Sequence, residues 1–293
     1  MANLVNRRLV ANTLAVFAVG GMGTYTASNY FTKNDFAESP NSEPHKVFGR
    51  GPAFKSLRLH SSERVNHNTK RLRLELPGGG RSISGVGLTS ALLTFSKPEG
   101  SWLPVVRPYT PVSKLDEPAF IDLLVKQYPN GKATSSSSHP SPAFAWTPNK
   151  FYHVYLIAGG AGITPIYQLA QGFLENPADK TKITVIFGVN TEEGLLLRTE
   201  FDAYKRAYPD RIDVYYTVSR PGSEFKPVPG VRSGFVTKEV LAEVMRGPEE
   251  ADTKIFVCGP PAMETALVGD GVGKGQPGIL KQLGYSQDRI NKF

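Results

Sequence analysis

Apolar and polar positions alternate along several short stretches in the first half of the chain. The alternation over residues 54–59 and 70–76 predicts two half-buried strands, and residues 91–95 and 120–126 predict two more. Glycine and proline interrupt the pattern, as in the run Pro77-Gly78-Gly79-Gly80. Short strands with such interruptions are typical of a small barrel or sandwich. We therefore expect a small antiparallel β-barrel domain over residues 51–150.

The pattern changes at about residue 151. Strands are predicted at residues 154–158, 183–189, 212–218 and 254–258, and they alternate with helical stretches at 166–174, 196–207, 237–245 and 261–267. Such alternation is typical of a parallel sheet with helices on both faces. We expect a second, α/β domain over residues 151–293. Ligands of these sheets bind beyond the carboxyl ends of the strands, which here are residues 159–165 and 258–261.

The first 50 residues fit neither pattern. Arg7 and Arg8 precede a mild apolar segment, about residues 9–30, which is long enough to span a bilayer if it is helical throughout. Three interpretations of residues 1–32 remain open: a membrane anchor, an organellar targeting segment and a secretory signal, of which the first two are compatible. Residues 33–50 predict a linker, because they are rich in polar residues and proline and have little periodicity.

The net charge and the cysteine content limit which binding partners, disulfides and metal sites are possible. The chain of 293 residues has a net charge of +8, which favours an acidic protein or an anionic surface. No finger, helix-turn-helix or other nucleic-acid motif is present. Cys258 is the only cysteine, which excludes intramolecular disulfides and cysteine-based metal sites. The five histidines lack ligand spacing, so we predict no metal.

A glycine turn, Gly159-Gly160-Ala161-Gly162-Ile163-Thr164-Pro165, connects a predicted strand to a predicted helix. Glycines let a ligand approach the backbone closely, and the helix that follows directs free N–H groups and the positive end of its dipole at the same place. Proline at position 165 differs from the dinucleotide fingerprint, which has a glycine there. The turn is suited to a phosphate or a flat cofactor edge, and a tight strand-to-helix corner is the alternative.

A second candidate is Arg107-Pro108-Tyr109-Thr110. An arginine can pair bidentately with a pyrophosphate. Tyr109 can lie flat against an aromatic ring system, and Thr110 offers a hydroxyl and an N–H group. The alternative is a surface arginine beside a tyrosine of the core.

Four motifs in order, at residues 107–113, 124–132, 159–165 and 258–263, resemble those of the NADH-cytochrome b5 reductases, and more broadly of the ferredoxin-reductase-like flavoenzymes. The resemblance extends from about residue 51 to the C-terminus, and it is closest to the fungal mitochondrial form. It implies a barrel that binds FAD, a domain that binds NADH, and cytochrome b5 as an acidic acceptor. It also implies a monomer anchored in the mitochondrial outer membrane, with a soluble intermembrane-space form.

The resemblance assigns roles to individual residues. Those implied to bind FAD are Arg107, Pro108, Tyr109, Thr110, Leu124, Lys126, Tyr128, Gly131, Lys132, Ala133 and Thr134. Those implied to lie where flavin and nicotinamide meet, or beside the nicotinamide, are Gly159, Gly160, Gly162, Thr164, Cys258, Gly259, Pro260 and Pro261, with Phe293 over the flavin and Ser219 near the adenosine ribose. Thr110, Thr164 and Cys258 are the catalytic candidates, and Cys258 shapes the hydride path without acting as a nucleophile.

The chain departs from the family pattern in two places. After Ala133-Thr134 a serine- and proline-rich stretch, residues 135–142, replaces about one barrel strand and its turn, so we expect a barrel with an open edge and a smaller core, which leaves impaired FAD binding as an alternative. Ser219-Arg220 stands where an acidic residue would bind the ribose of NADH, which weakens the preference for NADH over NADPH. We expect NADH because the rest of the pattern favours it.

Two rival functions remain open at this stage. One is a related flavoprotein that reduces a quinone or another carrier. The other is a truncated paralogue whose nucleotide domain folds while its barrel holds no flavin.

Overall fold

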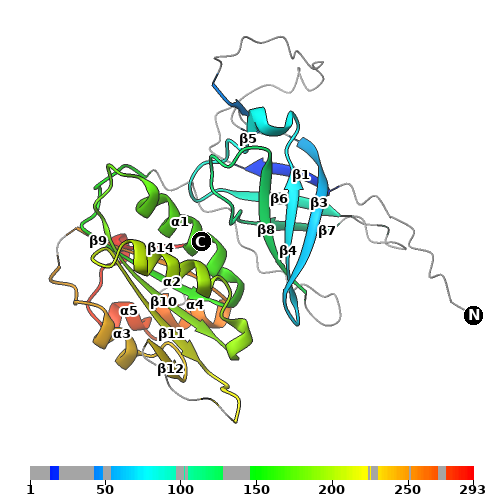
Figure 1. Cartoon of the computed structure of the whole chain (residues 1–293). Coiled ribbons are helices and arrows are strands. Elements are labelled where there is room, and N and C mark those ends of the chain that lie inside the picture. Colours follow the sequence, from blue (N-terminus) through cyan, green and yellow to red (C-terminus); the bar gives the residue numbers. More distant parts are fainter. Residues whose placement is uncertain are drawn as a thin grey trace, which may run out of the picture.

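The computed structural model describes residues 14–19, 43–48, 54–96, 102, 105–127, 146–223, 225, 230–250, 252–269 and 275–293. These residues form two lobes, an all-β lobe and an α/β lobe (Figure 1). The two-part architecture predicted from the sequence is confirmed.

The first lobe is a six-stranded antiparallel sheet with the order β7-β6-β1-β3-β4-β8. Its strands are β1 (Leu14–Val19), β3 (Phe54–Asn66), β4 (Thr69–Glu75), β6 (Ala91–Ser96), β7 (Val105–Tyr109) and β8 (Phe120–Lys126). A bridge between Pro111 and Leu123 joins the chain after β7 to β8, so the sheet curls back on itself as a barrel. The short parallel pair β2 (His45–Lys46) and β5 (Ser82–Ile83) and the 3-10 turn η1 (Gly79–Arg81) lie outside the sheet.

Alternation explains how the barrel packs. The buried side chains form one cluster, in which Leu74 and Leu76, and Ile121 and Leu123, occupy alternate positions. Its members are Val47, Phe48, Leu57, Leu74, Leu76, Val86, Leu92, Ile121 and Leu123. Burial of apolar area of this kind supplies most of the stability of a small barrel.

Strand β1 corrects the expected open edge of the barrel, and it shows that residues 14–19 are not helical in this structure. Within the apolar segment predicted to be a membrane helix or targeting segment, residues 14–19 form a strand that pairs with β3 on one side and β6 on the other. The open edge expected from the missing strand is therefore closed by the N-terminal segment, because β1 supplies backbone partners to both neighbours. The rest of residues 1–32 lies outside the described residues. Among the helices that the structure describes, none is long and apolar enough to cross a membrane.

The second lobe is a six-stranded parallel sheet with the order β12-β11-β10-β9-β13-β14. The strands are β9 (His153–Gly159), β10 (Lys182–Val189), β11 (Ile212–Val218), β12 (Val231–Ser233), β13 (Thr253–Cys258) and β14 (Ile290–Lys292). The helices are α1 (Ile163–Glu175), α2 (Arg198–Ala207), α3 (Lys238–Val244), α4 (Pro261–Val268) and α5 (Ile279–Gln282), with 3-10 turns η2 (Gly160–Gly162), η3 (Glu192–Gly194) and η4 (Gln287–Arg289). All four predicted strands and all four predicted helices are confirmed within a few residues.

The two faces of this sheet have separate cores. Helices α1 and α2 cover one face, where Phe173 and Phe201 are buried, and α3, α4 and α5 cover the other, where Leu241 is buried (Figure 1). Every residue of β9 is buried, as expected for a central parallel strand covered on both faces. The chain proceeds from β9 through β10 to β11 and then returns to place β13 on the other side of β9. This reversal next to β9 is the position where open α/β sheets bind ligands.

Candidate cofactor-binding cleft

The glycine turn lies at this reversal, at the carboxyl ends of β9 and β13. A Cβ atom added to Gly162 would lie 2.6 Å from the carbonyl carbon of Cys258 and 2.9 Å from the nitrogen of Gly259. A Cβ atom added to Gly159 would lie 2.8 Å from Pro260 Cδ. Glycine is needed at both positions because two predicted ligand-binding loops, at residues 159–165 and 258–261, touch each other.

The other side of the turn is open. Gly160 has a φ angle of +51°, and an added Cβ atom would meet nothing within 4 Å. Helix α1 begins at Ile163 with no acidic residue in its first turn. Thr164 is nearly buried and its hydroxyl donates to the carbonyl of Ala161 at 3.3 Å. A backbone open on one side, at the positive end of a helix, is suited to an anionic ligand.

Cys258 ends β13 next to this turn. Burial raises the pKa of its thiol to about 12, with a smaller contribution from the Glu264 carboxylate. Glu264 is itself fixed, since it accepts a hydrogen bond from the Gly259 N–H at 3.2 Å and pairs with Lys292 at 3.6 Å. The thiol is therefore neutral at physiological pH, and Cys258 offers shape to a ligand but no charge and no nucleophile.

The predicted FAD-binding strand is β7 in the barrel. Arg107 is partly exposed and donates from Nη1 to the Val106 carbonyl at 2.6 Å. Tyr109 packs against the barrel core, and Thr110 is nearly buried. Val112, two residues further on, belongs to the core cluster of α1 and α2. The end of β7 therefore leads directly into the contact between the lobes.

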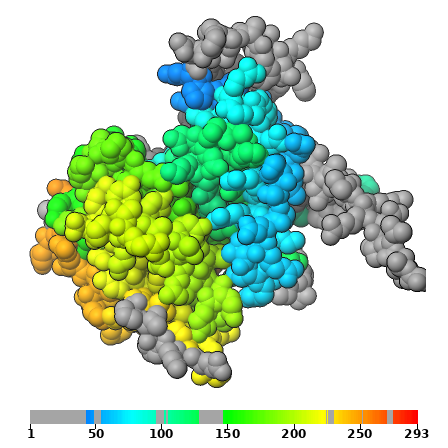
Figure 2. Space-filling view, in the orientation of Figure 1, coloured from blue at the N-terminus to red at the C-terminus, as the bar shows by residue number. Residues whose placement is uncertain are grey.

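Helix α1 is held against the barrel along its length. Gln168 accepts a hydrogen bond from the Thr89 N–H at 2.8 Å, and Glu175 pairs with Lys114 at 3.1 Å. Between them Gly172 makes room for Leu88, whose Cδ1 would lie 2.5 Å from an added Cβ atom. Figure 2 shows the lobes in contact, with the barrel in blue and cyan. The helix that starts at the glycine turn is thus the element that fixes the turn relative to the barrel.

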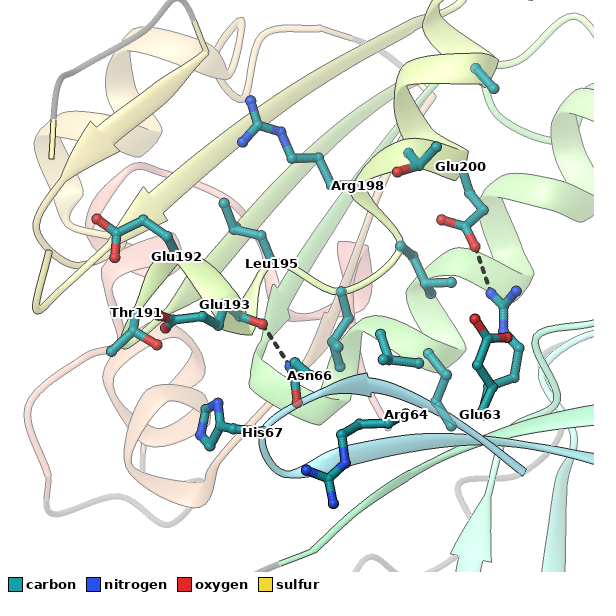
Figure 3. Close-up of a pocket in the computed structure, with 17 residues that line it drawn as sticks. Glu63, Arg64, Asn66, His67, Thr191, Glu192, Glu193, Leu195, Arg198 and Glu200 are labelled. Atoms are coloured by element: carbon teal, nitrogen blue, oxygen red, sulfur yellow. Dashed lines mark hydrogen bonds and ion pairs between the residues drawn. The ribbon is translucent and has the colours of Figure 1, made fainter. Parts of the chain in front are cut away.

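A second set of contacts joins the β3–β4 hairpin to the first turn of α2 and to the segment between β10 and α2. Asn66 donates to the Glu193 carbonyl at 2.6 Å, and Arg71 pairs with Glu200 at 2.6 Å (Figure 3). Between these contacts is an open cavity of about 1130 Å³, and Leu124 is the predicted FAD-binding residue that lines it. Residues 191–200 were not singled out from the sequence; their position just after the carboxyl end of β10 was the signal that could have done so.

Two further predicted residues, Ser219 and Phe293, lie at the carboxyl ends of strands of the parallel sheet. Ser219 follows β11, and its hydroxyl donates to Asn190 Oδ1 at 3.2 Å. Phe293 stacks on Phe256 with ring centroids 5.9 Å apart, and its N–H donates to Val257 at 3.1 Å. Pro108, Pro261 and Lys126 are described, whereas Tyr128, Gly131, Lys132, Ala133 and Thr134 lie outside the described residues. In the part of the chain that the structure describes, no group of three or more metal-binding side chains is present.

Two family models match the chain, an oxidoreductase FAD-binding domain over residues 56–139 and an oxidoreductase NAD-binding domain over residues 156–268. Together with the fold, they define an oxidoreductase that uses FAD and a nicotinamide dinucleotide. The chain is 41% identical over 289 residues to NADH-cytochrome b5 reductase 2 of Emericella nidulans, covering 93% of this chain and 87% of that protein. It is 44% identical over 261 residues to the protein of the same name from Botryotinia fuckeliana, covering 84% and 74%. The chain belongs to the NADH-cytochrome b5 reductase family.

Solved structures agree with this assignment. The cytochrome b5 reductase domain of Ulva prolifera nitrate reductase matches with a TM-score of 0.65 and 25% identity, over 81% of this chain and 96% of that chain. The CS-b5R domains of human Ncb5or match in fold, with a TM-score of 0.60 and 23% identity, over 89% and 76%. FAD and NADH are therefore the cofactors of this enzyme.

The predicted binding residues that the structure describes are chemically suited to these cofactors. Gly160 leaves one side of the turn open, and the first turn of α1 has no acidic residue to repel a phosphate. Arg107 in the middle of β7 and Lys126 at the end of β8 are cationic side chains, and Tyr109 and Phe293 are partly exposed aromatic side chains. Cationic side chains and free backbone N–H groups can bind the pyrophosphate of a flavin dinucleotide, and aromatic rings can pack against its flavin.

Proposed function

We propose that this enzyme passes electrons from NADH through FAD to cytochrome b5. One observation carries the proposal: the glycine turn packs against the Cys258 loop at the reversal of the sheet, and its helix α1 is bonded to the barrel through Gln168 and Glu175. The names of the relatives support the acceptor. When bound, FAD supplies the redox chemistry, because it takes two electrons as a hydride and releases them one at a time.

The residues of this chain bind FAD and orient its flavin ring. We assign the FAD pyrophosphate to Arg107, with Pro108 shaping the strand end, and the faces of the flavin to Tyr109 and Phe293. Thr110 holds the reactive edge of the flavin by its hydroxyl or N–H group. The remaining FAD contacts are assigned to Leu124, Lys126, Tyr128, Gly131, Lys132, Ala133 and Thr134.

The nicotinamide side is assigned to the two loops of the second lobe. Gly159, Gly160 and Gly162 bring the backbone close to the dinucleotide, and Thr164 donates or accepts at the start of α1. Cys258, with Gly259, Pro260 and Pro261, forms the adjoining wall, in contact with the glycine turn. Because the Cys258 thiol is neutral, this wall positions the nicotinamide without placing a charge beside it. Holding donor and acceptor rings in contact is the main catalytic contribution of the protein.

The proposed domain limits are 1–32 for the targeting and anchor segment, 33–50 for the linker, 51–150 for the FAD-binding domain and 151–293 for the NAD-binding domain. The two family models, which start at residues 56 and 156, support the last two. Strand β1 adds six residues of the first segment to the barrel.

We propose a location at the mitochondrial outer membrane, with a soluble intermembrane-space form. Arg7, Arg8 and the apolar stretch that follows support membrane anchoring. A segment cannot be a bilayer helix and a barrel strand in the same molecule, so we assign the strand conformation of residues 14–19 to the soluble form. Extraction of isolated mitochondria at alkaline pH tests this: two pools, one extracted and one retained, are expected, and a single retained pool contradicts the soluble form.

The partner is assigned from charge. A net charge of +8 favours association of this monomeric enzyme with an acidic haem protein. Reduction of cytochrome b5 should fall severalfold between low and physiological ionic strength, because salt screens the attraction. The rate of reduction of an uncharged quinone should not change with ionic strength. If the quinone is reduced faster than cytochrome b5 at every ionic strength, the acceptor is wrong and the related quinone-reducing flavoprotein is the better description.

A further inference from the structure

The carboxyl ends of β10 and β11 form a corner that the reaction described so far does not use. Val189 and Val218 are partners in the register of the two strands. Beyond them, the Ser219 N–H donates to the Val189 carbonyl at 2.9 Å and the Arg220 N–H donates to the Asn190 carbonyl at 2.8 Å. The Ser219 hydroxyl donates to Asn190 Oδ1 at 3.2 Å. The two backbone hydrogen bonds fix the main chain of the corner, and the third holds the Ser219 side chain at the edge of the sheet.

This corner lies where the adenosine half of a dinucleotide would bind. The end of β11 is two strands from the glycine turn, roughly 10 Å at the ordinary spacing of strands, and on the side away from Cys258. A dinucleotide whose nicotinamide lies over the glycine turn and the Cys258 loop can extend along this edge toward Ser219. In such sites a carboxylate binds the ribose 2′-hydroxyl of NADH, whereas an arginine accommodates the 2′-phosphate of NADPH.

The acid that contacts this corner is already engaged. Glu192 accepts hydrogen bonds from the Gly222 N–H at 3.2 Å and 3.4 Å, so its carboxylate stabilises the turn after Arg220. Ser219 itself carries no charge. At the position of Ser219 itself, the chain therefore has a hydroxyl and no carboxylate to bind a ribose 2′-hydroxyl or to repel a phosphate.

Two arginines stand near this edge, and their surroundings differ. Arg198 lies over the ring of Tyr216 at 5.7 Å and is 4.0 Å from the carboxylate of Asp202. Arg220 is exposed, and among the described residues it forms no ion pair. A guanidinium without a carboxylate partner, next to a serine hydroxyl, is suited to a phosphate dianion.

We propose that Arg220 and Ser219 bind the 2′-phosphate of NADPH, and that the enzyme oxidises NADPH as well as NADH. The inference rests on the proposed function, because it requires the dinucleotide to lie along this edge. With ferricyanide as an artificial acceptor, one NADPH reduces two ferricyanide ions and yields NADP⁺ and one proton. The acceptor is the same for both dinucleotides, so the comparison does not depend on the identity of the natural acceptor.

The kinetic test compares kcat/KM for NADPH and NADH in the full-length enzyme and its variants. Arg220→Ala should lower kcat/KM for NADPH about 10- to 100-fold, the range expected for one lost charge-assisted contact, and change the value for NADH less than twofold. Ser219→Asp should lower the NADPH value at least as much, because it adds a like charge beside the phosphate. Arg206→Ala, at an exposed arginine of α2, is the matched control and should change neither value.

A binding measurement separates this inference from the function. Titration calorimetry with 2′,5′-ADP and with ADP reports the 2′-phosphate contact without turnover. We expect Arg220→Ala to weaken 2′,5′-ADP at least tenfold and ADP less than twofold. If the wild type binds 2′,5′-ADP no better than the Arg220→Ala variant does, or prefers NADH over NADPH more than a thousandfold, the inference is overturned. If neither dinucleotide reduces ferricyanide while 2′,5′-ADP binding depends on Arg220, the proposed function fails and the phosphate site stands.

Discussion

At the scale of single residues, the glycine turn is where sequence and structure agree most closely. Its role as a close-approach loop follows from three glycines between a strand and a helix. The reason that glycine is required could not be predicted, because the atoms that exclude a side chain at Gly162 belong to Cys258 and Gly259, almost 100 residues further along the chain. A pattern of local sequence carries no information about such a contact.

Substitution of Gly162 tests this contact. Gly162→Ala would place a Cβ atom against the backbone of Cys258, which cannot move as a side chain could. We expect a loss of about 1–3 kcal/mol in the free energy of unfolding, as for other overpacked sites. Gly80→Ala is the control, because an added Cβ atom there meets nothing within 4 Å. Denaturant unfolding measures both, and equal midpoints for Gly162→Ala and the wild type would show that the two loops do not touch.

The thiol of Cys258 provides a pH-dependent prediction. Burial raises its pKa to about 12, compared with about 8.5 for a free cysteine. Since alkylation requires the thiolate, iodoacetamide should modify Cys258 in the folded enzyme roughly a thousandfold more slowly at pH 8 than it modifies a free thiol, with a rate that still rises above pH 10. Mass spectrometry measures the rate, and the denatured chain is the control. Modification that levels off near pH 8 would contradict a buried, neutral thiol.

At the scale of elements, the alternation of apolar and polar residues predicted the barrel strands, which have one side facing solvent. Apolar runs that alternate with helical stretches predicted the parallel sheet. Strand β1 was missed. Its sequence, Leu-Ala-Val-Phe-Ala-Val, is apolar throughout, and periodicity does not separate a strand paired on both edges from part of an apolar helix. Only the partners of β1, which are β3 and β6, decide between the two, and they begin 35 or more residues away.

Disruption of β1 tests its place in the barrel. Val16 pairs with Lys55 on one side and Thr94 on the other, and proline there removes an N–H group from a strand with two neighbours. We expect Val16→Pro to destabilise the barrel by about 1–3 kcal/mol, the cost of leaving a backbone partner unsatisfied, and to lower the FAD content of the purified protein.

Val16→Thr is the control, because threonine is equally suited to a strand. It should retain the FAD content of the wild type. A Val16→Pro protein with full FAD content and an unchanged melting temperature would mean that residues 14–19 contribute nothing to the barrel and serve the membrane alone.

At the scale of the whole molecule, the order of motifs predicted two domains with a flavin and a nicotinamide dinucleotide, and the family assignment bears this out. How the lobes meet could not be predicted. Thr89, Lys114 and Leu88 have no local signature that marks them as partners of α1, yet they fix the helix that begins at the glycine turn. The geometry of electron transfer therefore depends on contacts that only the fold reveals.

The most direct test of the account is an anaerobic titration of the purified full-length protein with NADH, followed by flavin absorption near 450 nm. We predict a yellow protein with one FAD per chain that bleaches completely with about one equivalent of NADH. A colourless protein that still binds NADH would contradict it, since the barrel would then hold no flavin. A yellow protein that NADH does not bleach would contradict it as well, since the two lobes would then not bring the cofactors together.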